Sequence, residues 1–447
     1  MLVSIKSILL ENQELQFPGG TPRRLNIQPS SGKATVIVGA KGCGKTTYLF
    51  QLIQGLLNSG VLRENIVYLN FADERLRSLK PNSHSLVAEA YFSLYPHKKN
   101  TEKVYFFFDE IQVVKGWEAM VDKLLLAEVC EVFLAGSSAN LLINNLPTES
   151  RVRGSAYELF PFSFPEFLDH RGLKSEEPLA TIDEYLIKHA WDKYPLLGGF
   201  PDSIDLEWGP LTRELRQKAL RATVLGDIVE RHDVSHPQAV LDLARTTLKS
   251  PTASYSVNKL TAYLKSLGHK VPKAVVADYL DWFEDAYFLF SLRLFDPQGR
   301  NVSASPKQIF PIDPALTLSL SPGPVDQAPL LKNLVFLALR RGYQNIHYYR
   351  TQSLKEVDFI VIRPGLDPLL VAFWPSLSSL KDQKRNLMAI IEALDELNLK
   401  AALVVSRDET DRITVNNRVI TALPIWRFLL LSPDQLNEVL KGRSGIV

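Results

Sequence analysis

A glycine-rich stretch near the N-terminus has the residue types and spacing that cradle a phosphate. The segment Val38-Gly39-Ala40-Lys41-Gly42-Cys43-Gly44-Lys45-Thr46-Thr47 fits the pattern GxxxxGK[ST]. Its glycines let the loop fold back so that backbone N–H groups point inward, and the helix that follows adds partial positive charge. Lys45 would reach the β- and γ-phosphates of ATP, and the Thr46 hydroxyl would bind Mg²⁺. We therefore expect residues 39–47 to bind ATP, the alternative being a glycine-rich turn that binds nothing.

Two adjacent acids further along the chain supply the partners that such a loop needs. Asp109 and Glu110 directly follow Val104–Phe108, a run too apolar to lie on the surface. A buried strand that ends there would place both acids at the edge of a sheet, beside the glycine-rich loop. Asp109 would hold the magnesium shell, and Glu110 would orient or deprotonate the attacking water. The alternative is a pair of acids that only caps the end of a strand.

A serine and two arginines are further candidates for the same chemistry. Ser137 follows the strand pattern Glu131–Ala135 and could sense the γ-phosphate, although a plain loop start fits the same residues. Arg151 and Arg153 lie on the next segment, where one of them could reach a neighbouring subunit as an arginine finger. The alternative is that both arginines are solvated on a surface loop.

The elements that must position these residues alternate in the first third of the chain. Short β-prone runs are separated there by amphipathic helical patterns, and residues 1–10 are expected to form a buried strand or helix. The four runs are Ala34–Val38, Ile66–Asn70, Val104–Phe108 and Glu131–Ala135. Three of the four are apolar on consecutive positions, which is typical of strands buried on both faces of a parallel sheet. This part of the chain is therefore predicted to be α/β.

The predicted secondary structure changes twice in the remaining two thirds of the chain. From about 164 to 234 the pattern is helical, interrupted by a turn signal at Gly198–Pro201. Short helical patterns and β-prone segments follow, and Pro and Gly cluster at 296–306 and 319–329. These clusters indicate a hairpin loop and a domain junction. The last portion is again mixed α/β.

Composition, charge and cysteine spacing limit the class of protein and the compartment that we expect. The chain has 447 residues, of which 46% are hydrophobic and 22% charged, as in soluble globular proteins. It carries 51 Lys and Arg against 49 Asp and Glu, so no global charge attracts it to nucleic acid. Its two cysteines, Cys43 and Cys130, have no paired spacing, which favours a reducing compartment and disfavours a structural zinc site. No apolar run approaches the ~20 residues of a membrane span, so we expect a cytoplasmic protein without membrane contact.

Several motifs together resemble a large prokaryotic family of AAA-type ATPases. They are Asp109-Glu110-Ile111-Gln112 followed by Gly116-Trp117-Glu118, then Gly136–Ala139, Phe160–Phe167 and Gly198–Pro201. The likeness covers nearly the whole chain in order. In that family, which is related to archaeal origin-recognition and STAND ATPases, the ATPase is followed by a winged-helix segment and a C-terminal restriction-nuclease-like domain of unknown function. One departure is Arg153-Gly154-Ser155, where family members often have Gly-Arg.

The resemblance implies a fold class and four domains. The class is α/β, with an N-terminal P-loop AAA-type ATPase on a parallel sheet, a helical lid, a winged helix and a C-terminal restriction-nuclease-like α/β domain. The ATPase would span residues 1–175, the lid 176–235, the winged helix 236–312 and the nuclease-like domain 313–447. The implied activity is ATP hydrolysis with Mg²⁺ by a homo-oligomer, in DNA transactions or in defence against mobile elements.

The predicted winged helix has a divided charge distribution. Its helical patterns Ser256–Leu267 and Val271–Ala286 are joined by Gly268-His269-Lys270, and the second helix of such a pair usually reads the major groove. An apolar stripe covers one side of this second pattern. The acids on its remaining face are Asp278, Asp281, Glu284 and Asp285, and the basic residues near its start are Lys259, Lys265, His269, Lys270 and Lys273. DNA binding through that start and a module without DNA contact both stay open.

The nuclease-like domain departs from its family at the positions that would cut. It keeps the motif Glu356-Val357-Asp358-Phe359. Lys332 stands where the family has glutamate on the first helix, and Ala372 and Trp374 replace an acid and a lysine on a strand. Phosphodiester cleavage needs clustered carboxylates for the metal and usually a lysine, so we expect a nuclease fold without nuclease activity. Lys332 could still hold a backbone phosphate, or Trp374 could fill the vacated site in a purely structural core.

Three functions compete on this interpretation. The leading one is an oligomeric ATPase that couples its nucleotide state to the binding of DNA or of a partner protein by the C-terminal modules. The second is a STAND-like switch or scaffold, in which ATP binding controls assembly and turnover is slow. The third is an ATP-dependent nuclease, which Lys332, Ala372 and Trp374 disfavour.

Overall fold

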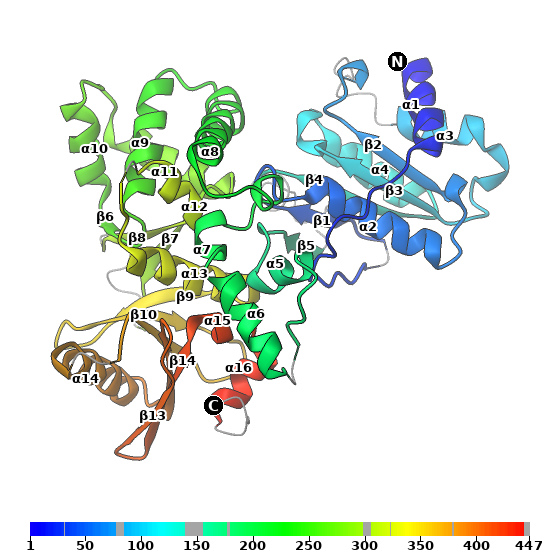
Figure 1. The fold of residues 1–447 in the computed structure, drawn as a ribbon. Helices are drawn as coiled ribbons and strands as arrows, with labels where there is room; N and C mark the ends of the chain where they lie inside the picture. Colours follow the sequence, from blue (N-terminus) through cyan, green and yellow to red (C-terminus); the bar gives the residue numbers. More distant parts are fainter. Residues whose placement is uncertain are drawn as a thin grey trace. The chain divides into compact units, whose positions relative to one another are not determined.

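A computed structural model describes residues 1–30, 32–76, 85–138, 155–176, 179–297, 305–321, 323–377 and 380–441. The chain forms two compact units, each of which contains helices and a sheet (Figure 1). Unit 1 comprises Met1–Pro161 and Asp285–Tyr287, and unit 2 comprises Phe162–Glu284 and Phe288–Val447. The α/β class predicted from the sequence is thus confirmed. None of the described helices is long and apolar enough to cross a membrane.

Unit 1 is built on a five-stranded parallel sheet with the strand order β2-β3-β4-β1-β5 (Figure 1). The bounds are β1 Thr35–Val38, β2 Ile66–Asn70, β3 Val104–Asp109, β4 Cys130–Gly136 and β5 Ser155–Glu158. The four predicted strands are confirmed to within one residue at each end. The fifth strand, β5, was not predicted, because its sequence Ser-Ala-Tyr-Glu contains no apolar run that would indicate a buried strand.

The described residues of unit 1 form four α-helices. Their bounds are α1 Leu2–Glu14, α2 Lys45–Asn58, α3 Leu86–Leu94 and α4 Trp117–Ala127. Helices α2 and α4 both contact β4, and α1 contacts α3 and β2. Of the two alternatives predicted for the N-terminal stretch, the helix is therefore the one that forms. It buries Ile5, Ile8 and Leu9 on its inner side, as an amphipathic helix on a sheet does.

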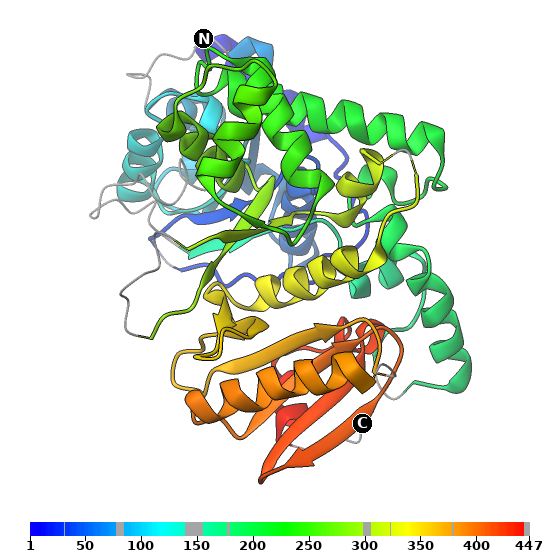
Figure 2. The same ribbon diagram turned by 90° about the vertical axis from the view of Figure 1, so that its left-hand side faces the viewer.

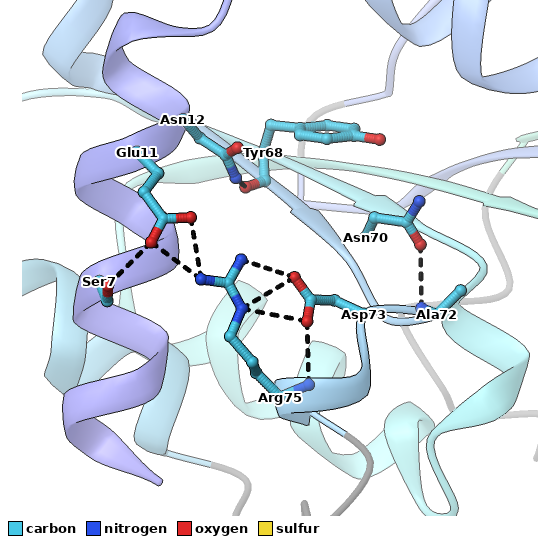
Figure 3. Close-up of polar contacts among 8 residues, drawn as sticks. All are labelled: Ser7, Glu11, Asn12, Tyr68, Asn70, Ala72, Asp73 and Arg75. Atoms are coloured by element: carbon cyan, nitrogen blue, oxygen red, sulfur yellow. Dashed lines mark hydrogen bonds and ion pairs between the residues drawn. The ribbon is translucent and has the colours of Figure 1, made fainter.

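Helix α1 also closes the edge of the sheet at β2. The Asn12 side-chain amide donates to the Tyr68 carbonyl oxygen at 2.8 Å (Figure 3), a group that an edge strand would otherwise leave unpaired. The Arg75 guanidinium, just past β2, donates to both Glu11 carboxylate oxygens at 2.8 and 2.9 Å. The same guanidinium binds Asp73 at 2.8 Å (Figure 3). These contacts hold α1 against β2 and the segment that follows it, and β2 pairs in parallel with β3, the strand that ends in Asp109.

Unit 2 begins with helices and continues into a second sheet. The earlier helices are α5 Phe164–His170, α6 Thr181–Trp191, α7 Tyr194–Leu197, α8 Pro210–Thr223 and α9 Pro237–Lys249. The later helices are α10 Val257–Ser266, α11 Lys273–Asp285, α12 Pro314–Ser319, α13 Gln327–Gly342, α14 Leu380–Glu396, α15 Ile425–Phe428 and α16 Pro433–Leu440. The last residue of α11 is counted with unit 1. Helix α8 continues directly into a π-helical stretch, Val224–Glu230.

The sheet of unit 2 has nine strands in the order β13-β14-β12-β11-β10-β9-β7-β8-β6. The bounds are β6 Ser254–Tyr255, β7 Leu289–Leu294, β8 Lys307–Pro311, β9 Ile346–Arg350, β10 Glu356–Val361, β11 Leu369–Trp374, β12 Ala401–Ser406, β13 Asp411–Val415 and β14 Arg418–Pro424. Strands β7 and β9 pair in parallel, with Arg293 opposite His347. The sheet therefore runs across the boundary predicted between residues 312 and 313, and the division into four domains stays a prediction. Helix α14, the orange helix in Figure 2, contacts β10 and β12.

Two of the motifs that carry the family resemblance contact each other in unit 2. The Phe162 N–H donates to the Gly199 carbonyl oxygen at 2.7 Å, and the Gly199 N–H donates to the Asp313 carboxylate at 2.6 Å. A Cβ on Gly198, where φ is +67°, would lie 2.1 Å from the same carboxylate. Burial raises the pKa of Asp313, whereas the charge of Arg216 lowers it. Gly198 and Gly199 thus have a structural role in unit 2, because neither position has room for a side chain.

Candidate nucleotide site

The glycine-rich loop joins β1 to α2, as the sequence predicts. Gly42 and Gly44 have φ angles of +79° and +96°, a conformation that glycine adopts without strain. A Cβ on Gly39 would lie 2.1 Å from the carbonyl oxygen of Leu159, so this position has no room for a side chain. The path of the loop therefore depends on these three glycines.

Lys45 begins α2 and is only 5% exposed. Its ammonium group donates to the carbonyl oxygens of Gly39 and Ala40 at 3.1 and 2.9 Å. These bonds hold the positive charge within the loop that is predicted to surround the phosphates. In the same loop Ala40 and Cys43 are buried, Gly44, Thr46 and Thr47 are half-buried, and Lys41 and Gly42 are exposed.

Asp109 ends β3 and is fully buried. Its Oδ2 accepts hydrogen bonds from the Thr46 hydroxyl at 2.6 Å and the Tyr68 hydroxyl at 3.2 Å, while Oδ1 accepts from the Glu110 N–H at 3.0 Å. Burial raises the pKa of Asp109, whereas the bond from Thr46 and the charge of Lys45 lower it. The structure thus brings together Thr46 and Asp109, the two predicted magnesium ligands, across 63 residues of sequence.

The donor atoms of Thr46 and Asp109 fit a magnesium ion. Hydroxyl and carboxylate oxygens are hard ligands, and Mg²⁺ usually takes one or two protein ligands and keeps several waters. Tyr68, which the sequence analysis missed, holds one Asp109 oxygen in place. Burial and the nearby Asp109 charge raise the pKa of the Tyr68 phenol, so it stays a neutral donor. No pattern marks this residue, since a tyrosine inside a strand is an ordinary core residue.

Glu110 lies just past β3 in a left-handed backbone conformation, with φ +50° and ψ 37°. Residues other than glycine adopt it rarely, and the surrounding structure must support it. Its carboxylate accepts a hydrogen bond from Gln112 Nε2 at 2.5 Å, and the same nitrogen lies 3.4 Å from Ser137 Oγ. The structure thus brings the predicted base and the predicted sensor together. The predicted fingers, Arg151 and Arg153, fall outside the described residues.

Arg23 supports the glycine-rich loop from the segment before β1. One guanidinium nitrogen donates to the Cys43 carbonyl oxygen at 2.7 Å, and the other donates to the Phe160 carbonyl oxygen at 2.5 Å. The Arg23 N–H donates in turn to the Gln51 side chain on α2 at 3.1 Å. This residue could not be predicted from the sequence, because its partners lie 20 and 137 positions away and no local pattern connects them.

The residue after the predicted sensor has a buried acidic partner within unit 1. Ser138 Oγ lies 2.8 and 3.0 Å from the two oxygens of the Asp285 carboxylate. Both residues are buried, so the expectation that Asp285 lies on a phosphate-facing surface is wrong. Glu284 is half-buried, and Asp278 and Asp281 are exposed. The acidic surface of α11 is therefore smaller than the sequence suggests.

The positions at which the sequence predicts a lost nuclease site hold an internal ion pair. Lys332 Nζ on α13 lies 2.6 Å from Asp358 Oδ1 on β10, and Asp358 Oδ2 accepts the Phe373 N–H at 2.8 Å. Ala372 and Trp374 are buried in an apolar cluster with residues of α14. The single carboxylate retained at these positions is thus already bound to a lysine.

The fold and the site together define a class of protein. The glycine-rich loop follows β1, Asp109 ends β3, and β4 lies between these two strands. Residues 31–168 match the family described as an AAA domain, so this part of the chain is an AAA-type P-loop domain. Residues 188–325 match a domain of unknown function.

Relatives extend this likeness over most of the chain. An uncharacterized protein of Haemophilus influenzae is 30% identical over 335 residues, which make up 73% of this chain and 78% of that protein. An uncharacterized protein of Methanocaldococcus jannaschii is 27% identical over 439 residues, 96% of this chain and 95% of that protein. A solved Walker-type ATPase of Pyrococcus abyssi is 16% identical, covers 64% of this chain and 90% of its own, and has a TM-score of 0.40. The chain belongs to the family of the Haemophilus influenzae protein.

Proposed function

We propose that the chain binds ATP with Mg²⁺ in the glycine-rich loop and hydrolyses it to ADP and phosphate. The observation that carries the proposal is the 2.6 Å bond between Thr46 and the buried Asp109, beside the loop that holds Lys45. The N–H groups of residues 39–47 would surround the phosphates, and Lys45 would neutralise charge on the β- and γ-phosphates. Mg²⁺, held by Thr46 and Asp109, supplies further charge neutralisation at the phosphate oxygens.

Hydrolysis also needs a base for the attacking water and groups that act on the γ-phosphate. In this proposal Glu110 takes a proton from the water while the water oxygen attacks the γ-phosphorus. The bond between the γ-phosphorus and the β–γ bridging oxygen breaks in the same step. Ser137 donates a hydrogen bond to a γ-phosphate oxygen. Arg151 or Arg153 of a neighbouring copy completes the site, which makes the active form a homo-oligomer.

We further propose that the nucleotide state controls the binding of DNA or of a partner protein by unit 2. Helices α9, α10 and α11 and strands β6, β7 and β8 follow the order of a winged helix, which supports this assignment. Exposed lysines near the start of α11 supply the charge that a phosphate backbone needs. They are Lys259, Lys265, Lys270 and Lys273. The exposed Asp278 and Asp281 would repel the backbone further along the helix, so DNA would contact only its start.

We also propose that unit 2 does not cleave DNA. The Asp358 charge is matched by Lys332 at 2.6 Å, and Ala372 and Trp374 offer no ligand. Metal-dependent cleavage requires several oxygen ligands around the ion. Because Lys332 is engaged internally and Trp374 is part of the core, these contacts favour the structural alternative at this position.

The test is a phosphate-release assay on the full-length chain with Mg²⁺ and ATP, with and without duplex DNA. We expect release that depends on Mg²⁺ and whose specific rate rises with protein concentration, because a neighbour supplies the arginine. ATP binding without phosphate release would overturn hydrolysis and support the STAND-like switch. A fully active monomer with ATP bound, seen by sedimentation at all concentrations, would remove the oligomer.

A plasmid-nicking assay with Mg²⁺ or Mn²⁺ tests the nuclease separately. We expect no nicking by the wild-type chain, because the Asp358 carboxylate is bound to Lys332 and the buried Ala372 and Trp374 offer no ligand. Metal-dependent nicking that is lost in Asp358→Ala would show that unit 2 is an active nuclease. The matched control is Asp367→Ala, since Asp367 is an exposed aspartate in the loop between β10 and β11.

A further inference from the structure

We propose that Gln112 is a positioning residue that holds Glu110 and Ser137 in one arrangement for attack on the γ-phosphate. The inference rests on the proposed ATPase function and adds a residue to its site. Gln112 lies in the 3₁₀ turn Ile111–Val113, directly after β3 and Glu110. The turn directs its side chain to both the carboxylate and the sensor hydroxyl.

The Gln112 amide can serve both partners at once. An amide nitrogen carries two hydrogens, and Nε2 lies 2.5 Å from Glu110 Oε2 and 3.4 Å from Ser137 Oγ. A glutamate side chain rotates about three bonds, so a bond to one carboxylate oxygen removes much of that freedom. The other carboxylate oxygen is then left to face the attacking water. Gln112 thereby sets the direction in which the base acts.

The surroundings of the amide fix which way round it lies. Gln112 Oε1 is buried and has no hydrogen-bond partner among the described residues. Reversing the amide would give Oε1 the place of Nε2 and set it against the Glu110 carboxylate, where two acceptors repel each other. The bond to Glu110 therefore dictates the orientation, although it leaves a buried carbonyl oxygen unpaired.

An unpaired buried acceptor lowers stability, and an apolar side chain of similar size would avoid this cost. A residue whose only role is structural would not require an amide at this position. Residues that reduce stability while they serve activity are typical of active sites. The backbone of Glu110 shows the same feature, because its φ of +50° is also unfavourable. Both observations point to a role of Gln112 in turnover.

The test replaces Gln112 by methionine, which keeps the length of the side chain and removes its hydrogen bonds. In Gln112→Met, kcat should fall about tenfold to a hundredfold, because a misplaced catalytic group has an effect of this order. The Kd for Mg²⁺-ATP should stay unchanged, since Lys45, Thr46 and Asp109 are untouched. The Tm should stay equal or rise, because the unpaired carbonyl is gone. The matched control is Val113→Ala, an exposed neighbour in the same turn, which should change none of the three.

A second comparison distinguishes positioning from a structural role. If Gln112 acts through Glu110 and Ser137, adding Gln112→Met to a chain that already carries Glu110→Gln and Ser137→Ala should not lower the residual single-turnover rate any further. A structural role predicts instead a lower Tm, weaker ATP binding and an additional loss on that background. A wild-type rate in Gln112→Met, or a fall in rate that follows a fall in Tm, would overturn the inference. A wild-type chain without any ATPase activity would overturn the proposed function itself.

Discussion

Each unit places an aspartate on a strand and a lysine on a nearby helix, and the two pairs are bonded differently. In unit 1, Lys45 donates to backbone carbonyl oxygens, and Asp109 accepts from hydroxyl groups. In unit 2, Lys332 and Asp358 bind each other at 2.6 Å. A carboxylate such as Asp109 can bind an external cation, because the nearby lysine is bonded to other groups. The carboxylate of Asp358 is instead occupied by its direct ion pair with Lys332.

Burial strengthens this difference. Asp109 is fully buried, whereas the side chain of Asp358 is 24% exposed. Burial disfavours the charged form of a carboxyl group, and it raises the pKa of Asp109 for this reason. A divalent cation would remove that cost, so unit 1 should gain stability when Mg²⁺ and ATP bind. Asp358 already has a counter-charge in Lys332 and should gain much less.

The largest expected effect comes from removing the lysine of unit 1. Lys45→Ala should weaken Mg²⁺-ATP binding by at least about a hundredfold, because a charged hydrogen bond to phosphate contributes on the order of 3 kcal/mol. Isothermal titration calorimetry measures this directly. Lys33→Ala is the matched control, since Lys33 is exposed just before β1 and should bind ATP as the wild type does. Equal affinity in Lys45→Ala would show that ATP binds elsewhere.

The next effect comes from neutralising the aspartate of unit 1. The wild type should gain about 2.7 kcal/mol of unfolding free energy at a ligand concentration a hundred times the Kd. Asp109→Asn should gain less than half of this, because the amide cannot replace the carboxylate as a magnesium ligand. Without ligand, the variant should be at least as stable as the wild type, since a buried charge has been removed. Thermal unfolding with and without Mg²⁺-ATP checks both, and an undiminished ligand effect in Asp109→Asn would contradict the assignment.

A smaller effect is expected when the charge of the lysine in unit 2 is reversed. Lys332→Glu should cost about 2 kcal/mol of unfolding free energy, because it replaces a part-buried ion pair by two like charges. Mn²⁺ should restore part of the loss, since two carboxylates can then share the ion. Lys400→Glu, at an exposed position, is the matched control. If Mn²⁺ stabilises the wild type as much as it stabilises the Lys332→Glu variant, Asp358 can bind a metal ion in the wild type, and the ion pair does not block it.

The smallest effect is a pH dependence of the Asp109→Asn variant. A carboxyl group whose pKa is raised by folding contributes stability at low pH and loses it as the pH rises through the raised pKa. Asparagine does not titrate. The stability advantage of Asp109→Asn over the wild type, both without ligand, should therefore grow as the pH rises from about 4, the usual pKa of aspartate, towards neutrality. An advantage that shrinks over this range in denaturant titrations would refute the pKa shift.

The arrangement of the candidate nucleotide site was largely predictable because its main residues follow local patterns. The glycine-rich loop and the acids after an apolar strand are each visible within about ten adjacent residues. Tyr68 and Arg23 were not visible, because they bond to groups 41 and 137 positions away. Such contacts arise only when the strands and the segment before β1 come together in the fold. Gln112 belongs to a motif that is visible in the sequence, but its bond to Glu110 could be seen only in the structure.

In α11 and in the C-terminal part of the chain, the sequence predicted elements better than contacts. The apolar stripe of α11 is confirmed by the buried Val276, Tyr279 and Phe283. Periodicity shows which face of a helix is apolar, and it does not show which polar residue another segment buries. Asp285 therefore looked exposed in the sequence, and its bond to Ser138 was not foreseen. The ion pair of Lys332 and Asp358 was likewise not foreseen, since the sequence indicated only that the metal ligands are lost.

The measurement that tests the account most directly compares one acid from each unit. Glu110→Gln and Asp358→Ala are mixed separately with Mg²⁺ and ATP, and the bound nucleotide is identified after a single-turnover incubation. We predict that Glu110→Gln binds ATP with wild-type affinity and that the ATP is recovered intact, because the amide cannot take the proton of the water. We predict wild-type hydrolysis by Asp358→Ala. Hydrolysis at the wild-type rate by Glu110→Gln would place the base elsewhere and contradict the account.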